Sequence, residues 1–132
     1  EGHIIGNHTY HHVELTKLTE EEMKQELRMT NDVIRQITGE TPVFARPPFG
    51  EWNKKKDFPE ELIPVLWNVD PLDWKTLNTA SVVNDIMKEV EDGDIILLHD
   101  SYPTSVEAAL QCIDLLQKQG YQFVTVDELM FG

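Results

Sequence analysis

Segments with strand character alternate with segments of helical periodicity, and this alternation constrains the fold more than any other feature of the sequence. The residues IILL within GDIILLHD (93–100) form an unbroken apolar run, which is typical of a strand buried on both faces. Strands are also predicted at 42–45, 65–70 and 121–126, helices at 19–39, 60–64, 81–91 and 104–119, and a final turn at 127–132. The order indicates βαβ units, and therefore an α/β fold with a parallel sheet or a (β/α) barrel.

The helix at 19–39 carries the clearest local signals. Thr19 and Glu22 form a T-x-x-E capping box ahead of it, and Gly39 stands where it should stop. Apolar residues recur at helical spacing between these two ends. The segment is therefore expected to pack one apolar face against a core.

Composition excludes several classes of function. A chain of 132 residues forms one domain at most, and its net charge of −13 argues against a nucleic-acid partner. No apolar run approaches the roughly 20 residues that cross a bilayer, so no transmembrane segment is predicted. The single cysteine, Cys112, lies at helical spacing with leucine and isoleucine, which favours a buried thiol in the core.

Polar residues gather where the predicted strands end. Active sites of parallel α/β folds lie at the carboxyl ends of the strands, so these clusters could converge on one site. The residues are His8, His12, Arg46, Asp70, Asp73, His99 and Asp100.

The histidines His8 and His12 are four positions apart in GNHTYHH (6–12). On a helical turn this spacing would put both imidazoles on one side, where they could bind one metal ion. Neutral imidazole is a good ligand for zinc. Taken alone the spacing is a weak signal, and a pair of histidines without metal remains the alternative.

Arg46 and His99 each have a chemical and a structural interpretation, whereas Asp73 has a chemical one and Asp70 a structural one. Arg46 stands in RPPFG, where two prolines stiffen the loop, but it could equally be a surface arginine beside a turn. Asp73 precedes Trp74, whose ring lowers the local dielectric and strengthens attraction to a cation. His99 leaves a buried strand and could be a general acid, or a core histidine held by a hydrogen bond. Asp70 is interpreted as a turn cap.

Four motifs together resemble the polysaccharide deacetylases of the NodB-homology type, carbohydrate esterase family 4. HTYHH resembles the H-[ST]-x-x-H motif, RPPFG the R-x-P-[YF]-G motif, DPLDW the D-x-x-D-W motif, and IILLHD the strand that carries L-x-H. They stand in the order of the family and span residues 8–100. The resemblance implies a distorted (β/α) barrel, of which residues 1–132 would be the C-terminal portion of one catalytic domain.

The resemblance also implies a role for each matching residue. His8 and His12 would bind a divalent metal, with zinc expected. Arg46 would orient a catalytic carboxylate, Asp73 would orient His99, and His99 would protonate the leaving amine. Further implied roles are an oxyanion contact from a backbone N–H and a pocket for the acetyl methyl group. The backbone N–H of Phe49 would make the oxyanion contact, and the pocket would be formed by Trp74, Leu97 and Pro48.

The activity implied is metal-dependent N-deacetylation of an N-acetylated glycan, with release of acetate. Peptidoglycan or a chitin-like polymer of N-acetylglucosamine would be the substrate, outside a bacterial cell at the wall or membrane surface. Two alternatives stay open: a catalytically inactive carbohydrate-binding or interaction module of the same fold, and a cytosolic metal amidohydrolase acting on a small molecule.

One family motif has no counterpart in this sequence. The first motif, T-F-D-D-G, supplies a general base and a third metal ligand, both aspartates, and no D-D pair occurs here. Catalytic zinc usually has three protein ligands, so two histidines alone leave it under-coordinated. We therefore expect an N-terminal fragment of the same domain as a partner, and expect the chain to be stable only with that fragment bound.

Overall fold

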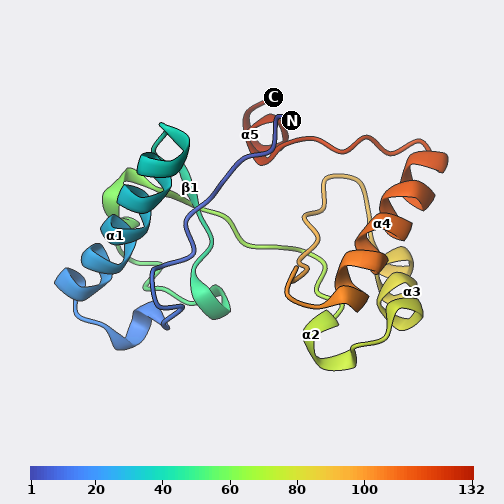
Figure 1. Ribbon diagram of the computed structural model, residues 1–132, viewed down its shortest axis with the longest axis horizontal. Coiled ribbons are helices and arrows are strands. Elements are labelled where there is room, and N and C mark those ends of the chain that lie inside the picture. Colours follow the sequence, from blue (N-terminus) through green and yellow to red (C-terminus); the bar gives the residue numbers. More distant parts are fainter. The chain divides into compact units, whose positions relative to one another are not determined.

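The computed structural model describes residues 1–132, which divide into two compact units, Glu1–Leu66 and Trp67–Gly132 (Figure 1). Each unit has its own small core. No helix in either unit combines the length and the apolar character that crossing a bilayer requires.

The first unit is built on helix α1 (Glu20–Thr38) and three short extended segments. Strand β1 (Phe44–Ala45) pairs in parallel with β2 (Ile63–Pro64), and Asn7 forms a parallel bridge to Ala45. Short 3-10 helices complete the unit: η1 (Leu15–Lys17), η2 (Pro48–Gly50) and η3 (Pro59–Glu61). Leu27 of α1 packs with Ala45 and Leu62, so the helix closes the core of this unit.

Helix α1 begins and ends where its local sequence predicts. The Thr19 hydroxyl accepts the N–H of Glu22, and the Glu22 carboxylate accepts the N–H of Thr19, so the capping box is formed. At the other end Gly39 adopts φ 85°, a left-handed conformation that glycine reaches without strain, and its N–H donates to the Arg35 carbonyl.

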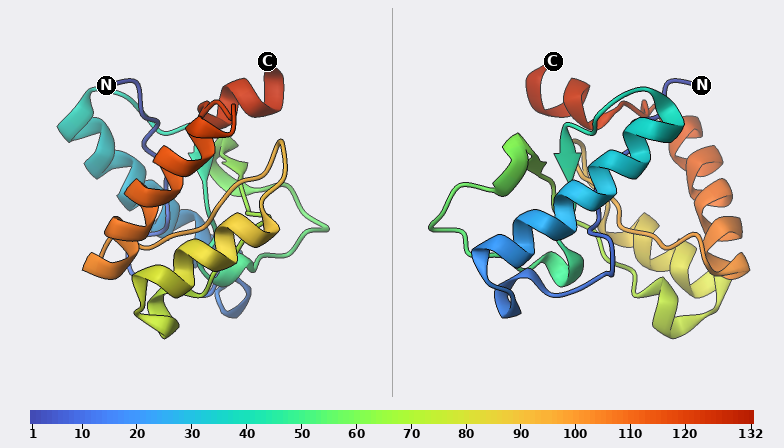
Figure 2. Two further views of the ribbon diagram at one scale, coloured as in Figure 1. Left: turned by 90° about the vertical axis from the view of Figure 1, so that its right-hand side faces the viewer. Right: turned by 60° about the vertical axis from the view of Figure 1, so that its left-hand side comes forward.

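The second unit consists mainly of helices: α2 (Asp73–Thr76), α3 (Thr79–Glu89), α4 (Pro103–Lys118) and α5 (Val126–Phe131). Helices α3 and α4 lie side by side in both views of Figure 2. A parallel bridge joins Val69 to Ile96 beneath them. The core contains Val69, Val82, Ile86, Ala108 and Cys112, which confirms the predicted burial of the single thiol.

Several predicted elements differ from those observed. The predicted helix at 60–64 is the 3-10 turn η3 followed by strand β2, and the predicted final turn is helix α5. The predicted strand at 121–126 is not formed, and those at 65–70 and 93–100 are reduced to one bridge. A strand persists only where a neighbour accepts and donates its backbone hydrogen bonds, and apolar character alone does not supply that neighbour.

Candidate functional site

The loop that carries His8 and His12 brings their side chains together. The two ring centroids are 4.9 Å apart in an edge arrangement. The rings do not meet on a helical turn, because residues 8–12 form no helix. Instead, Thr9 and His12 adopt positive φ values of 67° and 53°, and this fold of the backbone makes the rings meet.

The orientation of His8 is set by a backbone carbonyl. Its Nδ1 forms a hydrogen bond with the carbonyl oxygen of Arg46. A carbonyl can only accept, so Nδ1 carries the proton and Nε2 keeps its lone pair. Metal-binding histidines commonly have this arrangement, in which one ring nitrogen donates to an oxygen and the other faces the metal.

The residues of the chain fit a divalent metal only in part. His8 and His12 offer two suitable imidazoles, but no group of three or more histidine, cysteine, aspartate or glutamate side chains could hold an ion. Two ligands are one fewer than catalytic zinc usually takes from protein. The chain alone therefore supplies an incomplete ligand set.

The RPPFG loop lies next to the histidines. The ring of His12 meets the ring of Phe49 edge-on, with centroids 5.1 Å apart. Phe49 adopts φ 61°, within the short helix η2, while Pro48 before it is buried. This places the residue expected to contact the oxyanion beside the expected metal ligands.

Arg46 is half-buried, and its guanidinium binds the end of strand β2. Its Nε donates to the Val65 carbonyl at 3.4 Å and Nη2 to the Leu66 carbonyl at 3.3 Å. Burial lowers the pKa of Arg46 below its usual value. The side chain is thus held in place rather than extended into solvent; that it orients a carboxylate stays a prediction.

Asp73 and His99 form a buried pair in the second unit. The Asp73 side chain has no exposed surface, and its Oδ2 accepts the backbone N–H of His99 at 2.7 Å. Its Oδ1 lies 2.9 Å from Nδ1 of the same histidine. The carboxylate therefore fixes the tautomer with the proton on Nδ1 and leaves Nε2 available, on a ring that is 41% exposed.

The carboxylate of Asp73 is kept ionised by its neighbours. Burial raises its pKa, but the Ser105 hydroxyl and the ring and backbone N–H groups of His99 outweigh this effect, so the pKa lies below its usual value. Ser105 is itself buried, and its Oγ forms no hydrogen bond of ordinary geometry. Ser105 belongs to the first turn of α4, and from there its hydroxyl lowers the pKa of Asp73 in α2.

The other predicted residues of this unit have simpler surroundings. Trp74 follows Asp73 in α2 and is about half exposed, whereas Leu97 is buried. Asp70 accepts the N–H of Leu72 at 3.1 Å, as a turn cap does. Asp100 is exposed.

The predicted site residues fall into two groups, one in each unit. His8, His12, Arg46, Pro48 and Phe49 belong to Glu1–Leu66. Asp73, Trp74, Leu97 and His99 belong to Trp67–Gly132. The convergence of both groups on one site stays a prediction.

The sequence interpretation missed three polar residues that support these groups. Glu26 of α1 is buried and binds Nδ1 of His11 with both carboxylate oxygens, at 2.9 and 3.0 Å. Ser105 neighbours Asp73, and Asn7 precedes His8. For Glu26 and Ser105 the only signal in the sequence was a polar residue in a segment of helical periodicity, and for Asn7 there was none.

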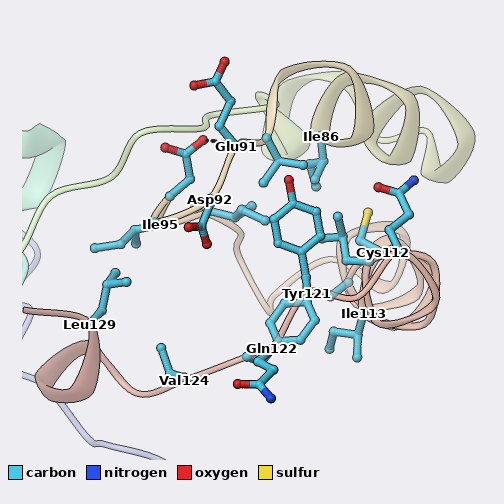
Figure 3. A pocket seen from close by; sticks show the side chains of 18 of the residues that line it. Ile86, Glu91, Asp92, Ile95, Cys112, Ile113, Tyr121, Gln122, Val124 and Leu129 are labelled. Carbon is cyan, nitrogen blue, oxygen red and sulfur yellow. Dashed lines mark hydrogen bonds between the residues drawn. The ribbon is translucent and has the colours of Figure 1, made fainter. Parts of the chain in front are cut away.

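A cavity of about 760 Å³ lies in the second unit between α3, α4 and the segment that leads to α5 (Figure 3). Apolar side chains such as Ile86, Ile113 and Leu129 line much of it, and none of the predicted site residues does. Ile96 and Leu98 face it, whereas Leu97 and His99 do not, as expected when side chains alternate along an extended segment.

Known sequences show which proteins this chain is similar to. The sequence profile described as polysaccharide deacetylase matches residues 1–59. The peptidoglycan-N-acetylmuramic acid deacetylase PdaC of Bacillus subtilis is 41% identical over 129 residues, which is 98% of this chain and 28% of PdaC. The chain is therefore similar to the polysaccharide deacetylases over nearly its whole length.

Other members of the polysaccharide deacetylase family are nearly as similar. The peptidoglycan-N-acetylglucosamine deacetylase PgdA of Listeria monocytogenes is 37% identical over 131 residues, 98% of this chain and 28% of PgdA. The solved structure of PdaC superposes with a TM-score of 0.92 over 97% of this chain and 63% of the PdaC chain. The predicted α/β fold, part of a distorted (β/α) barrel, is confirmed.

The family also contains a relative described as inactive. A pseudoenzyme of carbohydrate esterase family 4 from Bacillus anthracis is 28% identical, with a TM-score of 0.86 over 94% of this chain and 45% of that one. The chain spans about a quarter of the length of the first curated relatives and under two thirds of the solved chains.

Proposed function

We propose that this chain contributes the metal-binding histidines and the general acid of a peptidoglycan N-deacetylase. The observation that carries the proposal is shared by His8 and His99. In each, Nδ1 donates to a fixed oxygen, the Arg46 carbonyl or the Asp73 carboxylate, so the ring is held in one orientation. One arrangement suits a metal ligand and the other a proton donor. Peptidoglycan is favoured over chitin because the curated relatives named above act on peptidoglycan.

His8 and His12 would hold a divalent metal, for which we propose zinc. When bound, such a metal polarises the acetyl carbonyl and lowers the pKa of a bound water. The chain itself orients the reacting groups. The Phe49 backbone N–H would donate to the oxyanion, while Trp74, Leu97 and Pro48 would enclose the acetyl methyl group.

His99 would deliver the proton that the departing amine requires. Because Asp73 holds the proton on Nδ1, Nε2 would first take up a proton from solvent and then pass it to the amine nitrogen as the C–N bond breaks. Its Nε2 is the only ring nitrogen that Asp73 does not occupy, and the ring is partly exposed. The buried carboxylate holds the imidazole in one orientation, so that no reorientation is needed during the reaction. General acid catalysis of this kind contributes roughly 10²–10⁴-fold to the rate. Arg46 would orient the catalytic base, an aspartate outside this chain.

The partner we propose is the N-terminal portion of the same catalytic domain. It would supply the third metal ligand and the base that this sequence lacks. Three observations support it: the ligand set is incomplete, the solved relatives are longer than the matched part, and an apolar cavity borders residues 121–124, which form no strand. A strand added beside 121–125 would cover that apolar lining and pair the backbone. We place the assembled enzyme outside the cell, at the wall or membrane surface.

A second candidate is an inactive carbohydrate-binding or interaction module. The observation that favours it is the Bacillus anthracis relative described as a pseudoenzyme, together with the incomplete ligand set. The small-molecule amidohydrolase has no such support.

The test measures acetate release from purified peptidoglycan. The chain is co-expressed with the N-terminal portion of the catalytic domain of the Bacillus subtilis relative, with and without chelator. We expect metal-dependent release, which His12→Ala abolishes together with bound metal, while His99→Ala keeps the metal and loses about 10²–10⁴-fold in rate. His3→Ala, which changes an exposed histidine outside the proposed ligand set, is the matched control and should retain metal. Binding of peptidoglycan without acetate release would establish the module instead.

A further inference from the structure

Asn7 is a buried asparagine whose side-chain amide makes three hydrogen bonds. It is 1% exposed. Its Nδ2 donates to the Leu27 carbonyl at 2.9 Å and to Oδ1 of Asn31 at 2.8 Å, both on α1. Its Oδ1 accepts the backbone N–H of Thr9 at 2.9 Å. The side chain therefore ties the loop that follows it to the helix.

The backbone of Asn7 is fixed from the other side. Its N–H donates to the Phe44 carbonyl at 2.9 Å, and its carbonyl accepts the N–H of Arg46 at 2.8 Å. The carbonyl of Arg46 in turn accepts Nδ1 of His8. One residue thus connects β1, α1 and the first turn of the histidine loop, immediately before the first proposed ligand.

This loop needs such support because its conformation is unfavourable. Thr9 is β-branched, yet it adopts φ 67°, and His12 adopts φ 53°. Positive φ values in residues other than glycine persist only where the surroundings over-determine them. The bond from Asn7 to the Thr9 N–H acts at the first of these two positions, and the meeting of the His8 and His12 rings depends on both.

We propose that Asn7 is a positioning residue that preorganises His8 and His12 for metal, an inference that rests on the proposed function. Asparagine suits the task because it offers one acceptor and two donors from a single planar group. Aspartate at position 7 would present a buried carboxylate to the two acceptors on α1, Leu27 O and Asn31 Oδ1. Residues that hydrogen-bond to metal ligands and orient them typically contribute 10–100-fold to the affinity for the metal.

The experiment measures the dissociation constant for Zn²⁺ by competition with a chromogenic chelator, and the absorption spectrum with Co²⁺, in the same co-expressed protein. Asn7→Ala and Asn7→Asp should each weaken Zn²⁺ binding about 10–100-fold and alter the Co²⁺ spectrum. Asn31→Ala, which removes one of the two acceptors, should weaken binding in the same direction but less. Asn78→Ala is the control, because it removes the side-chain cap of α3 in the other unit and should leave the Zn²⁺ constant unchanged.

A failure of the inference about Asn7 can be told apart from a failure of the proposed function. If the Asn7 variants lose stability but keep the wild-type Zn²⁺ constant, Asn7 is structural only and the inference is overturned. If they do not fold, an unchanged constant in Asn31→Ala overturns it equally. If His8→Ala and His12→Ala also leave Zn²⁺ binding unchanged, the metal site itself is wrong and the proposed function fails.

Discussion

Replacing Asp73 by asparagine tests the buried pair with His99. The carboxylate accepts two N–H groups of His99, at 2.7 and 2.9 Å, and has no exposed surface. Asparagine keeps one acceptor oxygen and puts an NH₂ group where the other stood. One hydrogen bond is lost, and a bond to a charged acceptor contributes about 1.5–3 kcal/mol. We expect the free energy of unfolding at pH 7 to fall by that amount.

The loss of unfolding free energy in Asp73→Asn should become smaller at low pH. The pKa of Asp73 lies below its usual value in the folded protein. Its ionised form therefore stabilises the fold above the ordinary carboxyl pKa of about 4, and this contribution disappears as pH falls through the lowered folded pKa. The difference between wild type and Asp73→Asn should be constant above about pH 5 and shrink steadily below about pH 4.

Urea unfolding followed by circular dichroism measures both quantities across the pH range. Asp70→Asn makes the same chemical change three residues away, where the carboxylate caps an exposed turn, and should stay within about 0.5 kcal/mol of wild type. Equal losses for the two variants would refute the argument from burial. A loss that persists undiminished at pH 2 would refute the assignment to the ionised carboxylate.

Three further predictions concern single side chains. The Cys112 thiol is buried and its pKa is raised, so a thiol reagent at pH 8 should label it slowly in native buffer and fast in urea; rapid native labelling would contradict its place in the core. Leu27→Ala should cost about 2–5 kcal/mol of unfolding free energy, because Leu27 is 1% exposed; a loss under 1 kcal/mol in urea unfolding would show that this core is loose. Thr19→Ala should cost about 0.5–2 kcal/mol by removing the capping box, with Thr19→Ser close to wild type in the same measurement.

The limits of prediction from sequence follow from which interactions are local. Helix α1 was predicted with its caps because Thr19, Glu22 and Gly39 act on neighbours within four residues. The strand at 121–126 was predicted wrongly, because its apolar pattern carries no information about whether a partner strand lies beside it.

The candidate site shows the same division. The spacing of His8 and His12 suggested that the rings meet. The loop that brings them together could not be predicted, because its positive φ values involve Asn7 and its partners on α1. The Asp73–His99 pair spans 26 residues, and only the motif resemblance connected its two members. Asn7 escaped notice because its function depends on Leu27 and Asn31, which no spacing rule links to it.

The account requires the histidines of the first unit and His99 of the second to face one metal ion. Paramagnetic line broadening tests this directly: Mn²⁺ is added to the co-expressed protein and the ring resonances of its histidines are followed by NMR. The account predicts that His8, His12 and His99 broaden together while His3 stays sharp. Broadening of His8 and His12 with an unaffected His99 would separate the proton donor from the metal and contradict a single active site.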